Sequence, residues 1–106
     1  MNAYTPERWE IVEITTDKGE TIHKILGSWY GGFASSDSWR MSSGIEKIID
    51  KGDHWEIPNS SGSVYTCYKT AQGMSNYTRG IYNTYESELK KSKLGTMKVI
   101  PITNLL

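Results

Sequence analysis

Two short runs of alternating apolar and polar residues, joined by a tight turn, constrain the fold of this chain more than any other feature. Residues 8–15 alternate between two faces of an extended strand, and residues 21–30 form a second apolar run. Between them, Asp-Lys-Gly at 17–19 provides turn chemistry, because glycine adopts a positive φ without steric cost. The pattern predicts an antiparallel β-hairpin. We expect Trp9 and Ile11 on one face of the first strand, and Val12 and Ile14 on the other.

Further strands are predicted where β-branched and aromatic residues lie between Gly, Ser and Asp turns. Residues 46–50 fit either a helical turn or a strand, and the density of isoleucine favours the strand. Pro101 lacks a backbone donor, so it predicts a strand end or a sheet edge. The predicted strands cover residues 38–45, 54–58, 63–69 and 96–102.

The hydrophobic period changes after residue 75, where apolar residues recur every fourth position up to about residue 91. This spacing predicts an amphipathic helix, with Ser75 or Asn76 as its N-cap. Gly80 costs roughly 1 kcal/mol relative to Ala inside a helix, so it suggests a close approach to the sheet. Lysines at 90, 91 and 93 complement the helix dipole. The predicted buried stripe consists of Tyr77, Ile81, Tyr85 and Leu89, and it is widened by Met74 and Tyr82.

The order of five or so strands, one helix and one strand predicts an α+β domain. We expect a twisted, mainly antiparallel sheet of five to six strands with one helix packed across it. The length of 106 residues fits a single domain over 1–106, with 37% hydrophobic and 23% charged residues, as in soluble proteins. The single cysteine cannot form an intramolecular disulfide, and no apolar leader or membrane span is visible, so a cytoplasmic location without membrane contact is expected.

Charge and motif content narrow the classes of function. Twelve basic and twelve acidic residues give zero formal net charge, which argues against general nucleic-acid binding. The one local cluster of potential metal ligands lacks the alternation of a calcium loop, so neither metal nor cofactor is predicted. Cys67 lies mid-strand, where a buried, inert thiol is the usual case. The cluster consists of Asp50, Asp53, His54 and Glu56.

The segment 27–44, GSWYGGFASSDSWRMSSG, is the strongest candidate for a binding surface. Rigid aromatic rings supply contact area, Ser and Gly supply adaptable hydrogen bonding, and Arg40 can hold a carboxylate or phosphate through two hydrogen bonds. The structural alternative is a hairpin that buries its Trp side chains and pairs Arg40 with Asp37. The predicted binding residues are Trp29, Tyr30, Asp37, Ser38, Trp39, Arg40, Ser43 and Tyr65.

Two segments together resemble small uncharacterised accessory proteins of T4-like tailed bacteriophages. The first combines GSWYGG at 27–32 with DSWRMSSGI at 37–45, and the second is SSGSVYTC at 60–67. The likeness covers about a third of the chain and assigns no catalytic residue. It implies a role in binding and blocking a host component or a defence system.

Three functional hypotheses follow. The first is a non-enzymatic binding protein, an accessory or anti-defence inhibitor that binds a host protein. The second is a protein that binds or sequesters a small nucleotide, with bases stacked on Trp29, Trp39 or Tyr65 and phosphate on Arg40. The third is a small enzyme that uses the acidic cluster or Cys67. An uncovered hairpin edge is also compatible with a homodimer.

Overall fold

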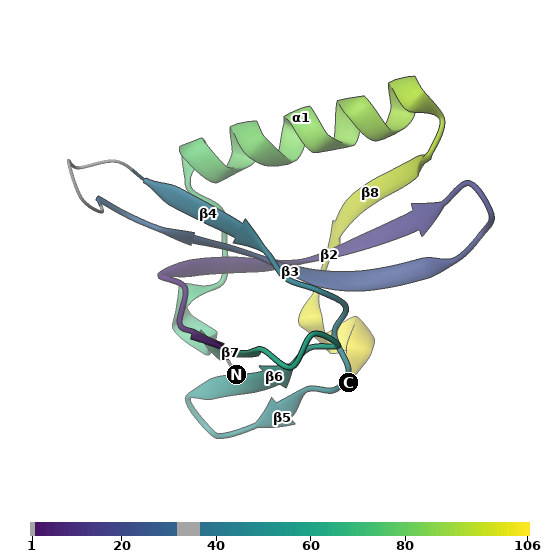
Figure 1. Cartoon of the computed structure of the whole chain (residues 1–106). Helices are drawn as coiled ribbons and strands as arrows, with labels where there is room; N and C mark the ends of the chain where they lie inside the picture. Colours follow the sequence, from purple (N-terminus) through teal and green to yellow (C-terminus); the bar gives the residue numbers. More distant parts are fainter. Residues whose placement is uncertain (1, 32–36) are drawn as a thin grey trace.

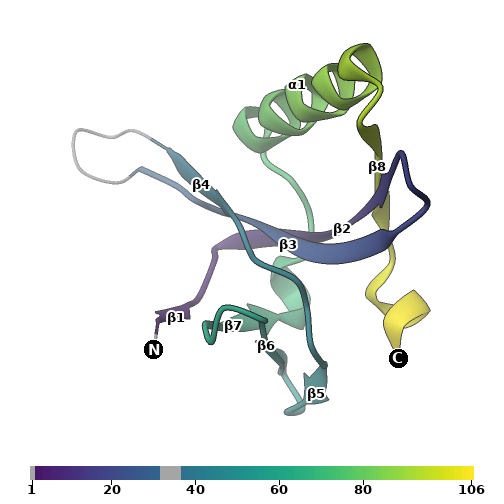
Figure 2. The ribbon, with the colours of Figure 1, turned by 45° about the vertical axis from the view of Figure 1, so that its right-hand side comes forward.

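Three layers build the protein, whose computed structural model describes residues 2–31 and 37–106. Helix α1 lies over one four-stranded sheet, and a second four-stranded sheet lies beneath the first (Figures 1 and 2). The upper sheet has the order β4-β3-β2-β8 and the lower one β1-β7-β6-β5. In chain order the elements are β1 (Ala3–Tyr4), β2 (Arg8–Thr16), β3 (Thr21–Trp29), β4 (Ser38–Met41), β5 (Ile49–Asp50), β6 (His54–Pro58), β7 (Val64–Tyr68), the 3-10 helix η2 (Lys69–Ala71), α1 (Asn76–Ser92), β8 (Gly95–Ile100) and the 3-10 helix η3 (Ile102–Leu105).

The α+β class is confirmed, but the prediction of a single sheet of five to six strands is wrong. The chain leaves the upper sheet after β4 and builds β5, β6 and β7 in the lower one. The N-terminal strand β1 joins β7 in parallel, with Tyr4 in register with Tyr65. Alternation along a strand reports which residues share a face, and it carries no signal for which strands share a sheet. The two-residue strands β1 and β5 are also too short to show a period.

The predicted hairpin is present as β2 and β3, which pair from Arg8 and Ser28 to Thr15 and Thr21. Gly19 has a φ of 85° in the turn and donates its N–H to the Thr16 carbonyl oxygen at 2.9 Å. The two faces of β2 follow the predicted alternation, because they enter different hydrophobic cores.

One core lies between the two sheets, and the other lies between the upper sheet and α1. The first buries Trp9 and Ile11 from β2 together with residues of β3, β6, β7 and the C-terminal segment. The second buries Val12, Leu26 and Met97 beneath α1. The upper sheet is therefore the central layer of the molecule, and both faces of β2 are buried at these positions.

The strand predicted over 38–45 ends at Met41. Ser42 is buried, and its Oγ accepts the N–H of Ile25 at 2.8 Å, so a side chain takes the place of the ladder carbonyl. The chain then touches the lower sheet through an isolated bridge between Ile45 and Asn59. Of the ambiguous residues 46–50, only Ile49–Asp50 forms a strand.

Helix α1 begins directly after its predicted N-cap residue Ser75 and ends at Ser92. Ser75 accepts the N–H of Thr78 at 3.2 Å, and Lys93 ends the helix in the left-handed conformation with φ 58°. The buried face is rotated from the predicted stripe, because Thr78, rather than the 40%-exposed Tyr77, is buried. The suggested close approach at Gly80 is wrong, since a Cβ there would meet no heavy atom within 4 Å.

The last strand, β8, lies at an edge of the upper sheet and is followed directly by Pro101, as predicted. One of its backbone carbonyl groups is hydrogen-bonded by a helix side chain. Tyr82 of α1 donates its hydroxyl to the Met97 carbonyl oxygen at 3.2 Å. In the described residues, no helix is long and apolar enough to cross a membrane.

Candidate functional site

Strand β4 forms the other edge of the upper sheet, and half of its backbone groups point away from β3. Ser42 donates its N–H to the Ile25 carbonyl oxygen at 2.8 Å, in the register that continues the β3–β4 pairing. Backbone groups alternate along an antiparallel strand, so the N–H and C=O groups of Ser38 and Arg40 also face β3. Those of Trp39 and Met41 therefore point outward. No other described strand pairs with β4, and Figure 2 shows it at the side of the molecule.

Trp39 lies on the face of β4 that is covered by α1. Its ring meets Tyr85 edge to face, with 5.6 Å between the ring centroids. Trp39 and Met41 pack against the core beneath the helix, while Tyr85 remains 43% exposed. This side of β4 therefore presents a partly exposed aromatic ridge, which we call the Trp39 ridge (Trp39 and Tyr85).

Arg40 lies on the opposite face of β4, because neighbouring residues of a strand point to opposite sides. Its guanidinium carbon lies 4.6 Å from the centroid of the Tyr4 ring, a cation–π contact. Arg40 is exposed, and no ion pair or side-chain hydrogen bond between described residues includes it. Trp39 and Arg40 are thus adjacent in sequence but lie on two different surfaces.

Tyr65 is a core residue with 0% exposure, because the N-terminal strand covers it. Its ring lies 5.0 Å from that of Tyr4, and its buried hydroxyl lies close to the Arg40 guanidinium without a hydrogen bond of ordinary geometry to any described residue. Burial raises the pKa of Tyr65 to about 12, against the opposing effect of the positive charge on Arg40. Tyr65 therefore supports the Arg40 side from beneath rather than offering a free ring face.

The remaining predicted residues lie in β3, in β4 and in the segments next to these two strands. Tyr30 is 44% exposed, and Trp29 is half-buried and donates its Nε1 to the Thr5 carbonyl oxygen at 3.0 Å. Ser38 is exposed, and Ser43 donates its hydroxyl to Ser61 at 2.8 Å. The residues Gly32, Phe33, Ala34, Ser35 and Ser36 lie outside the described residues.

Of the structural alternative for this segment, the Arg40–Asp37 ion pair is wrong, while Trp29 and Trp39 are indeed partly buried. Asp37 instead accepts the N–H of Gly31 through its Oδ1 at 3.0 Å. The Arg40 guanidinium lies over Tyr4, from a strand distant in sequence. Its charge is held in position by an aromatic ring rather than by a carboxylate.

Two residues of the site, Tyr4 and Tyr85, were not predicted from the sequence. Tyr4 belongs to a two-residue strand, which leaves no periodic signal. Tyr85 matches the helical stripe and was expected to be buried, but in the rotated helix its side chain is 43% exposed. The available signal for Tyr4 was a lone aromatic residue in an otherwise polar N-terminal stretch.

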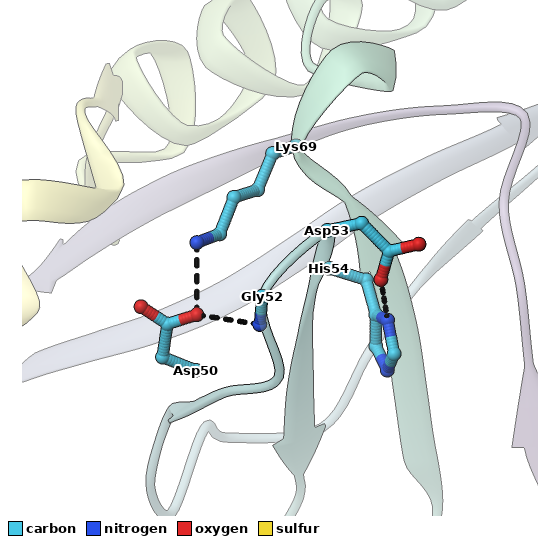
Figure 3. A network of polar contacts seen from close by, with 5 residues as sticks. All are labelled: Asp50, Gly52, Asp53, His54 and Lys69. Atoms are coloured by element: carbon cyan, nitrogen blue, oxygen red, sulfur yellow. Dashed lines mark hydrogen bonds and ion pairs between the residues drawn. The ribbon is translucent and has the colours of Figure 1, made fainter.

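Three members of the acidic cluster considered for an enzyme, Asp50, Asp53 and His54, do not converge (Figure 3). The Oδ1 of Asp50 accepts a hydrogen bond from the Lys69 ammonium at 2.8 Å and one from the Gly52 N–H at 2.9 Å. Asp53 contacts His54 Nδ1 at 2.6 Å, and this pair points away from Asp50. The described residues contain no group of three or more His, Cys, Asp or Glu side chains suited to a metal ion. The arrangement stabilises a turn.

The other chemical candidates are likewise dispersed. Cys67 is fully buried, and burial raises its pKa to about 12, so the thiolate needed for nucleophilic attack is suppressed. The rings required for nucleotide stacking do not share one face. Trp39 packs on the helix side, whereas Trp29 and Tyr65 contact Tyr4 between the sheets.

A shallow hollow of about 410 Å³ lies far from β4, where the β2–β3 turn meets the end of α1. Two lysines, Lys90 and Lys93, line it, and they sit at the helix C-terminus. The helix carbonyl groups there already favour cations, and Asp17 adds a negative charge to the rim. An anion would meet opposing charges, so the hollow is not a convincing ligand site.

No family model, curated protein or solved structure matches this chain. The geometry of β4 therefore carries the functional conclusion.

Proposed function

We propose that this protein is a non-enzymatic binding protein that takes up an extended segment of a partner protein along the outer edge of β4. The observation that carries the proposal is the direction of the Trp39 and Met41 backbone groups, which face away from β3. An extended segment that pairs with these groups would add a fifth strand to the upper sheet. Exposed strand edges are the usual sites of such pairing.

The side chains around this edge suit recognition as well as pairing. The Trp39 ridge offers partly exposed aromatic area on one side, and Arg40 offers a positive charge on the other. Aromatic and arginine side chains are the residue types that most often dominate binding energy at protein interfaces. We further propose that the partner is a host protein that the chain inhibits, a role supported by the resemblance to phage accessory proteins.

The test is capture of a partner from bacterial lysate on tagged protein, with matched tryptophan variants. A combined Trp39→Ala/Arg40→Ala variant should lose the partner, while Trp55→Ala should retain it. Trp55 is a suitable control, because it is a partly buried tryptophan of the lower sheet that contacts Lys69. Failure to capture any specific partner, or equal capture by the combined variant, would reject the proposal.

Hydrogen–deuterium exchange supplies a second readout that depends on backbone pairing. In the free protein, the amides of Trp39 and Met41 should exchange rapidly, and that of Arg40 should exchange slowly. Bound partner should slow the exchange at Trp39 and Met41. Protection confined to the lower sheet would place the partner elsewhere.

A further inference from the structure

The partner of β4 can be described chemically, because the two sides of this strand differ. A segment added to the sheet would direct alternate side chains to opposite faces. One set would meet the Trp39 ridge, which is apolar and partly exposed. The other set would meet Arg40, which is exposed and cationic.

Arg40 is a preorganised charge, because its guanidinium lies over the Tyr4 ring and close to the Tyr65 hydroxyl. The Tyr4 ring supports one face of its guanidinium at 4.6 Å, and the Tyr4 ring itself is held against Tyr65 and Trp29. No carboxylate among the described residues pairs with Arg40. A guanidinium offers donors in a planar fork that matches a carboxylate, and cross-strand neighbours lie within its reach.

We infer that β4 binds an extended acidic segment in which a carboxylate residue, facing Arg40, is next to a large apolar residue, facing the Trp39 ridge. This inference rests on the proposed strand pairing at β4 and adds which side chains of the partner are recognised. Charge complementarity selects this occupant over a second copy of the chain. The β4 sequence Ser38-Trp39-Arg40-Met41 contains no acid, and the nearby Asp37 carboxylate is engaged by the Gly31 N–H.

The experiment is selection of peptides from a display library of random seven-residue segments, followed by measurement of binding to the purified protein. Wild-type protein should enrich peptides with Asp or Glu adjacent to a large apolar residue. Arg40→Glu should weaken the selected peptide by about tenfold to a hundredfold, the range expected for a charge-assisted hydrogen bond. Arg79→Glu is the matched control, because Arg79 is an exposed arginine on α1 that lies near Tyr82 and the opposite sheet edge.

Charge reversal separates recognition from damage to the fold. A peptide in which the acid is replaced by Lys should recover binding to Arg40→Glu, which a misfolded variant could not do. Peptide N-methylation should weaken binding at alternate positions only, because only alternate amides face β4.

Three results overturn the inference, and they can be told apart. Peptides that show the alternating N-methylation pattern but no acidic preference, or that bind Arg40→Glu equally well, leave the proposed strand pairing intact and refute the acidic partner. A selection that yields no peptide sensitive to N-methylation refutes both. Self-association of the free chain through β4, seen by sedimentation, would replace the acidic peptide with a second copy.

Discussion

The two edge strands of the upper sheet, β8 and β4, differ in whether their outward backbone groups have partners. At β8, one outward carbonyl group is occupied, because the Tyr82 hydroxyl of α1 donates to the Met97 carbonyl oxygen at 3.2 Å. At β4, the backbone groups of Trp39 and Met41 meet no other described strand. Natural sheets usually protect exposed edges against unwanted pairing. The outer edge of β4 is therefore the feature on which the proposed strand pairing rests.

The largest expected effect concerns how β8 is held against β2. Gly95→Ala should lower the free energy of unfolding by about 3 kcal/mol, as for severe overpacking. The reason is that a Cβ at Gly95 would lie 2.3 Å from the Thr15 carbonyl oxygen. Urea denaturation followed by circular dichroism measures the change. A loss below about 0.5 kcal/mol, the range of ordinary surface substitutions, would show that this edge is loosely held.

Removal of the Tyr82 hydroxyl should open the covered edge. Tyr82→Phe keeps the ring beneath α1 but removes the hydrogen bond to Met97, at an expected cost of about 1 kcal/mol. Sedimentation should also detect more self-association, because an edge carbonyl is freed. If association is unchanged while stability falls, the helix alone protects β8 and the hydroxyl contributes only stability.

Gly80→Ala should stabilise the protein by about 1 kcal/mol, because the helix gains a better former and the new Cβ meets nothing within 4 Å. This variant stiffens the helix that covers β8 and should leave binding at β4 unchanged. Thermal unfolding and peptide affinity are measured together. A change in peptide affinity would show that the two edges are coupled through α1.

Alkaline pH should lower the free energy of unfolding, and part of the decrease should come from Tyr82, which contacts β8. Burial raises the pKa of Tyr82 above its ordinary value of 10.0, and it raises those of Tyr65 and Cys67 to about 12. The unfolded chain therefore releases these protons first, so their stabilisation is complete below about pH 9 and is lost as pH rises toward 12. Denaturation midpoints measured over this range should fall, and Tyr82→Phe should fall less steeply. Equal slopes would exclude Tyr82 as a contributor.

The smallest effect is expected for nucleotides. Mono-, di- and cyclic nucleotides should leave the melting temperature unchanged, because Trp39 and Trp29 lie on opposite faces of the upper sheet. Differential scanning fluorimetry makes the comparison. A reproducible increase with any of them would favour the sequestering hypothesis over strand pairing at β4.

Part of the site follows from local sequence and part does not. The alternation of residues 38–41 shows that Trp39 and Arg40 cannot share a face once a strand is assumed. The support of Arg40 by Tyr4 could not be predicted, because it joins residues 36 positions apart through a strand of two residues. The burial of Tyr65 has the same cause, since β1 covers it.

Local chemistry accounts for the β2–β3 hairpin, the Gly19 turn and the limits of α1, because each depends on neighbours within a few residues. The two faces of β2 also follow from its alternation. Only packing decided that the strands divide into two sheets, that α1 turns Thr78 inward, and that Tyr82 occupies a carbonyl group of β8 while no described strand pairs with the outer edge of β4. These outcomes depend on contacts between distant segments, for which a strand period and a helix period carry no information.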